Sequence, residues 1–165
     1  MSDSRLQPFD ARCAEEVASW PLSEDEARVW GGQGTPWPVH ASVVRSWHEE
    51  PDVQPWLLPE AMAPMAYGEI WIDPEESEVE LGRLIVRPDA RGRGVGRLLV
   101  TSLLRQAAGT ALPTAFVRVA PDSAAALACY RHAGFVRVWD EERLRFNAGQ
   151  PLAYEWLRHD LPAPN

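Results

Sequence analysis

The chain contains no lysine, because all 16 of its basic residues are arginines. This absence excludes a lysine nucleophile, a Schiff base and a phosphate-binding loop of the Walker type, which needs a lysine. Cysteine is scarce too: Cys13 and Cys129 lie far apart, without the spacing of a zinc site or a redox motif. We therefore expect both thiols to be reduced and no metal to be bound.

Long apolar runs are also missing, so no segment is expected to cross a bilayer. The first residues lack the basic start and apolar stretch of a signal peptide, and we expect a cytoplasmic protein. The 24 acidic residues outnumber the basic ones and give a net charge of −8. This charge argues against nucleic acid or an anionic membrane as partner, and it weakly favours a cationic small molecule.

A chain of 165 residues, 45% of them hydrophobic, is expected to form one domain with its own core. Helical and β-rich patterns alternate along it, so the domain is predicted to be mixed α+β. Turn residues at 73–77 predict a hairpin between the strands on either side. The predicted helices cover 10–20, 23–30, 42–50, 94–108 and 123–132, and the predicted strands cover 5–9, 53–58, 66–72, 79–86, 114–120, 136–139 and 152–158.

The glycine-rich turn at residues 91–96 (RGRGVG) carries the strongest functional signal. It lies within residues 83–105, where six arginines and one aspartate reverse the charge of an otherwise acidic chain. Glycines let the backbone approach an anion, and the first N–H groups of a helix attract negative charge. The turn is therefore predicted to bind phosphate. It is neither a Walker loop nor a complete dinucleotide fingerprint, which would need a third glycine.

Two stretches of the sequence resemble the GCN5-related N-acetyltransferase (GNAT) family. The stretch from Glu80 to Gly96, ELGRLIVRPDARGRGVG, is similar to that family's acetyl-CoA motif. The stretch from Ser123 to Phe135 resembles its Asn-x-x-Ala…Tyr-x-x-x-Gly-Phe segment, with serine where asparagine is usual. Both occur in the family's order and spacing, and the resemblance covers residues 66–139. The N-terminal half indicates no subfamily.

The resemblance implies a central mixed, mostly antiparallel sheet flanked by helices, with two neighbouring parallel strands splayed apart. It implies a single N-acetyltransferase domain over residues 1–165, with the acceptor side mainly in 1–65, the acetyl-CoA-binding core in 66–139 and closing strands in 140–165. Acetyl-CoA would be the co-substrate, without a metal. The residues implied at this cofactor are Leu84, Ile85 and Val86 along the pantetheine arm, Arg91, Gly92, Arg93, Gly94, Val95, Gly96 and Arg97 at the pyrophosphate, and Ser123 as a polar contact.

Acetylation of an amine requires a base for the ammonium group, donors for the oxyanion, and a proton or dipole for the departing thiolate. The resemblance assigns the last role to Tyr130, and an ordinary phenol pKa near 10 suits the protonation of a thiolate. The alternative is that Tyr130 is a core residue packed near Leu127 and Phe135.

Two glutamates compete for the role of base. Glu80 lies on the strand before the glycine-rich turn, where family members that use a strand glutamate often carry it, and period-two alternation would place it on the face of Leu84 and Val86. Glu69 shares a face of the partner strand with Trp71, which we expect to line the acceptor pocket. Apolar neighbours should raise the pKa of such a carboxyl group, and repulsion would raise one further if the two faced each other across the hairpin. Each could instead be an exposed glutamate paired with an arginine.

The remaining aromatic residues give weaker signals. Trp20, Trp30, Trp47 and Trp56 could form an aromatic wall for a cation, although a place in the hydrophobic core is the simpler interpretation. The histidines have no serine or cysteine partner at a recognisable spacing, so a covalent acetyl-enzyme is not expected.

The sequence therefore predicts an enzyme that moves an acetyl group from acetyl-CoA to a primary amine, on a small molecule or a peptide N-terminus, by direct attack in a ternary complex. The alternative is a non-catalytic acyl-CoA-binding or sensing domain. Nucleic acid and membrane are not expected as partners, and a homodimer is left open.

Overall fold

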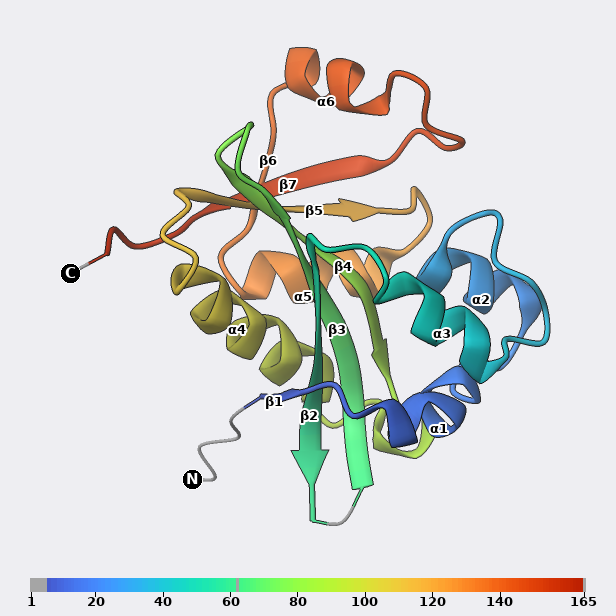
Figure 1. Ribbon diagram of the computed structural model, residues 1–165. Coiled ribbons are helices and arrows are strands. Elements are labelled where there is room, and N and C mark those ends of the chain that lie inside the picture. Colours follow the sequence, from blue (N-terminus) through green and yellow to red (C-terminus); the bar gives the residue numbers. More distant parts are fainter. Residues whose placement is uncertain (1–5, 62, 165) are drawn as a thin grey trace.

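A seven-stranded sheet runs through the computed structural model, which describes residues 6–61 and 63–164 (Figure 1). Neighbouring strands are antiparallel except for β4 and β5, which are parallel, so the mixed, mostly antiparallel sheet is confirmed. In sheet order the strands are β1 (Gln7–Pro8), β2 (Val53–Glu60), β3 (Ala63–Asp73), β4 (Glu78–Val86), β5 (Thr114–Val119), β7 (Glu155–Asp160) and β6 (Val136–Arg137).

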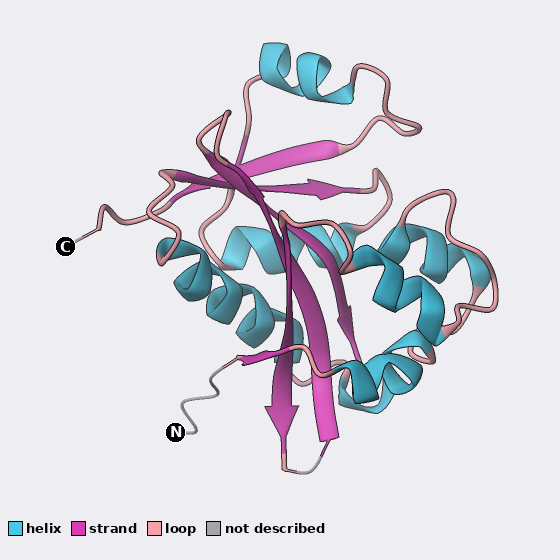
Figure 2. Cartoon of the chain, viewed as in Figure 1, coloured by secondary structure: helices cyan, strands magenta, loops and turns pink. Residues whose placement is uncertain are grey.

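Helices cover both faces of this sheet (Figure 2). Ser23 caps the second helix by accepting a hydrogen bond from the backbone N–H of Glu26 at 3.1 Å, in the Ser-x-x-Glu pattern that is typical of a helix start. None of the described helices is long and apolar enough to cross a membrane. The helices are α1 (Ala14–Ala18), α2 (Glu24–Gly31), α3 (Ala41–Trp47), α4 (Val95–Ala108), α5 (Ala124–His132) and α6 (Asp140–Asn147), with 3₁₀ turns at Ala11–Cys13 and Pro88–Ala90.

The alternation of side chains along β3 divides the interior into two cores. Ile70 packs beneath α4 with Leu99 and Leu103, in a cluster that also includes residues of β4 and β5. Tyr67 points to the opposite face and packs with Trp30 and other residues of α1 to α3. The sheet is therefore buried on both sides at its centre, where the predicted site residues of β3 and β4 lie.

The C-terminal part differs from the prediction. Residues 140–147, which have no apolar repeat that would predict a helix, form α6. The ring of Phe146 holds this helix on the sheet by packing edge-on against Phe116, with 5.4 Å between centroids, and against Trp156 at 5.1 Å. The predicted strand at 152–158 is wrong at its start, because β7 begins at Glu155 after the turn that leaves α6.

Strands β4 and β5 separate soon after they meet. Their described ladder contains three pairs and ends at Glu80 and Phe116. Beyond that point residues 81–86 of β4 and 117–119 of β5 have no backbone pairing with each other. The splay of parallel strands implied by the family resemblance is therefore present.

A β-bulge in β4 lies beside the splay. Tyr67 pairs with Ile85 and Glu69 pairs with Gly82, so β4 has one residue more than β3 over this interval. Arg83 occupies the bulge with a φ of 48°, in the left-handed region that non-glycine residues seldom adopt.

The bulge reverses the side-chain alternation along β4. Leu84 and Val86 pack against the core under α4, whereas a Cβ on Gly82 would touch the ring of Trp71 on the opposite face. The expectation that Glu80 shares a face with Leu84 and Val86 is therefore wrong. The extra residue at Arg83 turns the second half of the strand over, and one strand supplies side chains to both faces.

Candidate active site

A cleft of about 780 Å³ opens where β4 and β5 separate. On the side of α4 and α5 it is lined by Gly96, Cys129 and Tyr130, and on the other side by Glu80 and Arg118. Residues of α2 contribute to its wall as well. The cleft therefore connects the glycine-rich turn with side chains on the far face of the sheet.

The glycine-rich turn has the backbone geometry of an anion site. Gly92 and Gly94 have φ values of 75° and 78°, and open space lies where a side chain would begin at either one. Gly94 precedes α4, and no side chain caps this helix start. The first N–H groups of α4 are thus available to an anion, and its dipole favours negative charge there.

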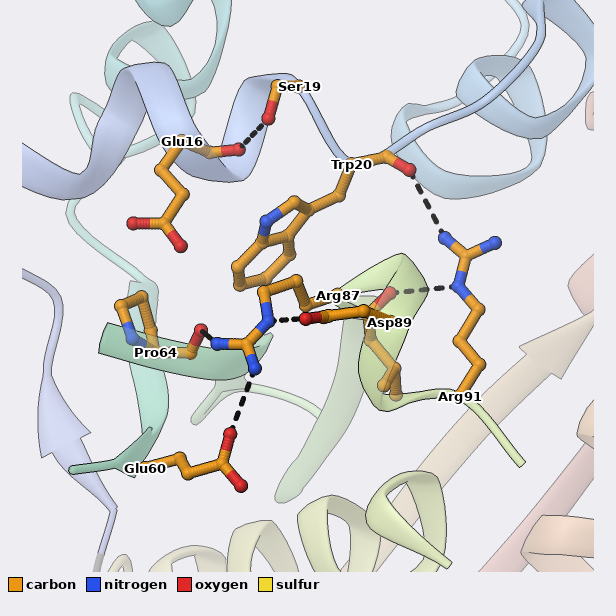
Figure 3. Close-up of polar contacts among 9 residues, drawn as sticks. Glu16, Ser19, Trp20, Glu60, Pro64, Arg87, Asp89 and Arg91 are labelled. Carbon is orange, nitrogen blue, oxygen red and sulfur yellow. Dashed lines mark hydrogen bonds and ion pairs between the residues drawn. The ribbon is translucent and has the colours of Figure 1, made fainter. Parts of the chain in front are cut away.

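The guanidinium group of Arg91 turns back into the protein and braces the turn (Figure 3). Its Nε donates to the carbonyl of Val86 at 2.9 Å, and its Nη2 donates to the carbonyl of Trp20 at 3.2 Å and to Glu26 at 2.5 Å. Arg93 and Arg97, in contrast, make no side-chain ion pair with any described residue. Their guanidinium groups are therefore the ones free to meet phosphate.

Tyr130 presents a hydroxyl group without a hydrogen-bond partner in the described part of the chain, on the wall of the cleft. Its ring also packs edge-on against Phe135, with 5.7 Å between centroids. Burial, followed by the proximity of Cys129 and Glu80, raises the pKa of the phenol. Tyr130 thus packs against Phe135 and also lines the cleft, and its raised pKa favours the protonated phenol.

Ser123 begins α5 at the cleft but does not cap it with its side chain. The serine that stands where the family usually has asparagine therefore keeps its hydroxyl group for another partner.

Glu80 lines the cleft as one half of a two-bond ion pair. The Nε and Nη2 atoms of Arg118 donate to its two carboxylate oxygens at 2.5 and 2.9 Å. Arg118 is itself held by Gln150 at 3.1 Å and stacks over the ring of Trp156 at 4.7 Å. A partly buried bidentate pair of this kind fixes the position of the carboxylate.

Glu69 lies behind the cleft wall, with none of its surface exposed. Its carboxylate accepts hydrogen bonds from the hydroxyl of Tyr67, from Nε1 of Trp71 at 2.6 Å and from Nη1 of Arg83 at 2.8 Å. Burial raises the pKa of Glu69, as predicted, although Arg83 and the hydrogen bonds oppose the shift. The hypothesis that it faces Glu80 across the hairpin is wrong, because the register pairs Glu69 with Gly82.

His48 belongs to the same network and was missed by the sequence analysis. Its Nε2 lies 2.8 Å from the hydroxyl of Tyr67, at the end of α3. Burial, followed by the charge of Arg83, lowers the pKa of His48. The contact joins residues 19 positions apart through tertiary packing, so no local pattern could have indicated it.

The tryptophans divide between core and cleft. Trp20 and Trp30 are buried and Trp47 and Trp56 pack against core clusters, which confirms the core interpretation. Trp30 and Trp71 also line the cleft, and the role of Trp71 in an acceptor pocket stays a prediction. Residues 6–61 and 63–164 contain no group of three or more histidine, cysteine, aspartate or glutamate residues placed to hold a metal ion.

Comparison of the sequence with known proteins identifies relatives of this chain. The family model described as "Acetyltransferase (GNAT) family" matches residues 15–135. A mycothiol acetyltransferase of Streptomyces scabiei (strain 87.22) is 33% identical over 130 residues, covering 74% of this chain and 40% of that protein. A second, of Streptomyces coelicolor (strain ATCC BAA-471 / A3(2) / M145), is 45% identical over 62 residues, covering 38% and 20%. The match thus spans less than half the length of each of these relatives.

Solved structures share the fold at low sequence identity. Aminoglycoside acetyltransferase AAC(6')-Ib in complex with ribostamycin and coenzyme A has a TM-score of 0.75 at 15% identity, covering 94% of this chain and 92% of that one. Spermidine N-acetyltransferase from Vibrio cholerae, in complex with CoA and spermine, has a TM-score of 0.73 at 13% identity, covering 94% of each chain. These similarities establish the architecture.

The buried network leads to a prediction about stability. We expect Glu69→Ala to lower the free energy of unfolding by about 3–5 kcal/mol, because it leaves Arg83 partly buried without its partner. Glu60→Ala is the matched control, since Glu60 pairs with Arg87 at 2.9 Å but is 42% exposed, and we expect a loss of about 0–1 kcal/mol. Urea unfolding measures both, and equal losses would contradict a structural role for the buried pair.

Proposed function

This chain belongs to the acetyltransferase (GNAT) family, and we propose that it transfers an acetyl group from acetyl-CoA to a primary amine in a ternary complex. The observation that carries the proposal is the continuous cleft between β4 and β5. The cleft leads from the uncapped N-terminus of α4 to the phenol of Tyr130 on one face of the sheet and to the carboxylate of Glu80 on the other. A domain that only binds acetyl-CoA needs the helix N-terminus but needs neither the phenol nor the carboxylate.

The cofactor half of the cleft fits acetyl-CoA. In the proposal the pyrophosphate contacts the backbone amides of residues 92–97, with Arg93 and Arg97 supplying positive charge. The pantetheine arm lies along the unpaired edge of Leu84 and Ile85. Val86 contributes less than expected, because its carbonyl already accepts from Arg91, which acts as a brace rather than a phosphate ligand.

The chemical step follows from the positions of Glu80 and Tyr130. Glu80 takes a proton from the ammonium group, and the free amine nitrogen attacks the thioester carbonyl carbon. The tetrahedral intermediate then loses the second nitrogen proton to solvent, and its carbon–sulfur bond breaks as the thiolate departs, which leaves a neutral amide. Tyr130 stabilises that thiolate by donating a hydrogen bond. Because burial raises the pKa of Tyr130 above its ordinary value of 10, while a thiol has a pKa of about 8.5, the proton stays mainly on the phenol oxygen.

Arg118 positions the base in this scheme. Its two hydrogen bonds hold the Glu80 carboxylate at the last pair of the β4–β5 ladder, where the strands begin to separate. Glu69 is less suited to the role, because three donors surround its carboxylate and Trp71 and Arg83 separate it from the cleft.

We place this activity in the cytoplasm, which is consistent with the free thiols of Cys13 and Cys129. A homodimer is compatible with the proposal but not required by it, since one chain supplies every group described above. Small molecules and peptide N-termini are the acceptors considered, with no role for nucleic acid or membrane.

The proposed function predicts that acetyl-CoA releases its thiol steadily only when an amine acceptor is present. Thiol release is measured with a colorimetric reagent across a panel of primary amines, and initial rates at varied concentrations of both substrates should give intersecting lines. A domain that binds acetyl-CoA tightly but never releases thiol would be a sensor, and parallel lines would indicate a covalent acetyl-enzyme.

Glu80→Gln should lower kcat by about 10²- to 10⁴-fold near pH 7, because the variant cannot accept the ammonium proton. The deficit should shrink as pH rises, since more of the amine is then already deprotonated. Glu141→Gln, at an exposed position of α6, is the control and should leave kcat unchanged. An undiminished kcat for Glu80→Gln would remove Glu80 from the mechanism.

Tyr130→Phe should lower kcat at least about tenfold while changing the affinity for acetyl-CoA less than about twofold, because the ring and its packing on Phe135 are kept. In the unsubstituted enzyme burial raises the pKa of Tyr130, so any fall in kcat caused by its ionisation should occur above the ordinary phenol value of 10. A large loss of cofactor affinity in the variant would instead show a packing role.

A further inference from the structure

Arg83 adopts an unfavourable backbone conformation at the wall of the cleft. Its φ of 48° costs conformational energy that a glycine would avoid, yet the chain carries an arginine there. Strained residues of this kind persist where the surroundings hold them in place, and they concentrate at functional sites. Arg83 is therefore a candidate functional residue, and the contacts of its side chain indicate its role.

Four contacts hold Arg83 in this conformation. Its Nη1 donates to the buried Glu69 at 2.8 Å, and its guanidinium lies 4.3 Å from the ring centroid of Trp47 and 5.0 Å from that of Trp71. The indole of Trp30 donates to its backbone carbonyl at 2.9 Å. The guanidinium group is thus preorganised, so it loses little conformational entropy when a ligand binds.

These contacts leave two of the three guanidinium nitrogens of Arg83 without a hydrogen bond. Nη1 is bonded to Glu69, and Nε is buried without a partner. Nη2 has no hydrogen bond to any described residue and is not among the buried atoms. Since Arg83 lines the cleft, this group is placed to donate to an oxygen atom of a bound molecule.

The charges around the cleft are nearly balanced, in contrast to the net charge of the chain. Of the carboxylates in its wall, Glu26 is paired with Arg91 and Glu80 with Arg118. Asp122 is the one without an ion pair among the described lining residues, and it lies on the loop before α5. A polycation would find few free carboxylates here, so the overall acidity does not favour a polyamine acceptor.

We propose that Arg83 binds the acceptor, and that the acceptor is an amine carrying a carbonyl or carboxylate oxygen within a few bonds, as in an amino acid or an aminoacyl amide. This inference rests on the proposed acetyl transfer and names its substrate class. The amine faces Glu80, while the oxygen accepts a hydrogen bond from Nη2 of Arg83. Trp71 lies against Arg83 and is the cross-strand partner of Glu80, so the two polar groups flank one aromatic surface.

Three amines of differing chemistry test the class with the unsubstituted protein. L-Phenylalaninamide and phenethylamine share a ring and a primary amine but differ in the carboxamide, and spermidine is the polycation. Rates of thiol release are expressed per concentration of free amine, because the three amines differ in pKa. We expect kcat/KM for the amide to exceed that for phenethylamine about tenfold or more, as for a charge-assisted hydrogen bond, and spermidine to be poorest.

The ratio of the two kcat/KM values, amide over phenethylamine, then isolates the role of Arg83, because the intrinsic difference between the amines cancels between variants. Arg83→Gln should bring this ratio down about tenfold. Arg87→Gln is the matched control: Arg87 is 19% exposed against 20% for Arg83, but it bonds Glu60, Asp89 and the carbonyl of Pro64 away from the cleft (Figure 3). The Arg87→Gln variant should show the same amide-to-phenethylamine ratio of kcat/KM as the unsubstituted protein.

A second variant covers the case in which Arg83→Gln does not fold because Glu69 loses its partner. Arg83→Gln/Glu69→Gln removes both charges of the pair and should show the same fall in the ratio. Preference for phenethylamine or spermidine in the unsubstituted protein, or an unchanged ratio in the folded variants, would overturn the acceptor class and leave acetyl transfer standing. Absence of thiol release with every amine would overturn both.

Discussion

The strand pair β4–β5 stops pairing after Glu80 and Phe116, and the candidate site depends on this interruption. A longer ladder would satisfy the inner backbone groups of residues 81–86 with β5 and would leave no cleft. Unpaired N–H and C=O groups inside a protein are costly unless they find other partners. Two carbonyls of this stretch are bonded by side chains, that of Arg83 by Trp30 and that of Val86 by Arg91. The edge between them is suited to a ligand with amide groups of its own.

The bulge at Arg83 lets one strand serve both halves of the cleft. Before it, Glu80 and Gly82 face Trp71, and after it Leu84 and Val86 face α4. The glutamate–arginine pairs then neutralise most charges of the wall, so the net charge of −8 describes the outer surface rather than the site. The choice of acceptor is therefore a matter of individual hydrogen-bond donors, and the overall acidity of the chain is a poor guide to it.

Features set by short stretches of chain could be predicted from the sequence. The start of α2 at Ser23 and the hairpin of β3 and β4 each depend on a few adjacent residues, and each occurs as predicted. Helix α6 could not be predicted, because its support comes from distant Phe116 and Trp156 rather than from an apolar repeat. The bulge was missed although Gly82 directly precedes Arg83 and an isolated glycine in a strand is a signal of one. The extra residue at Arg83 reversed the face assigned to Leu84 and Val86. The bond between His48 and Tyr67 likewise exists only through tertiary packing.

Titration of coenzyme A into the protein in a calorimeter tests most directly whether the separated strands and the glycine-rich turn form a cofactor site. We expect binding with one-to-one stoichiometry, and an affinity at least about tenfold lower for Gly94→Val, because valine cannot adopt a φ of 78° without strain. Gly34→Val, at an exposed loop glycine without a positive φ, should bind as the unsubstituted protein does. No heat from the unsubstituted protein, or equal affinity for Gly94→Val, would contradict a cofactor site at this turn.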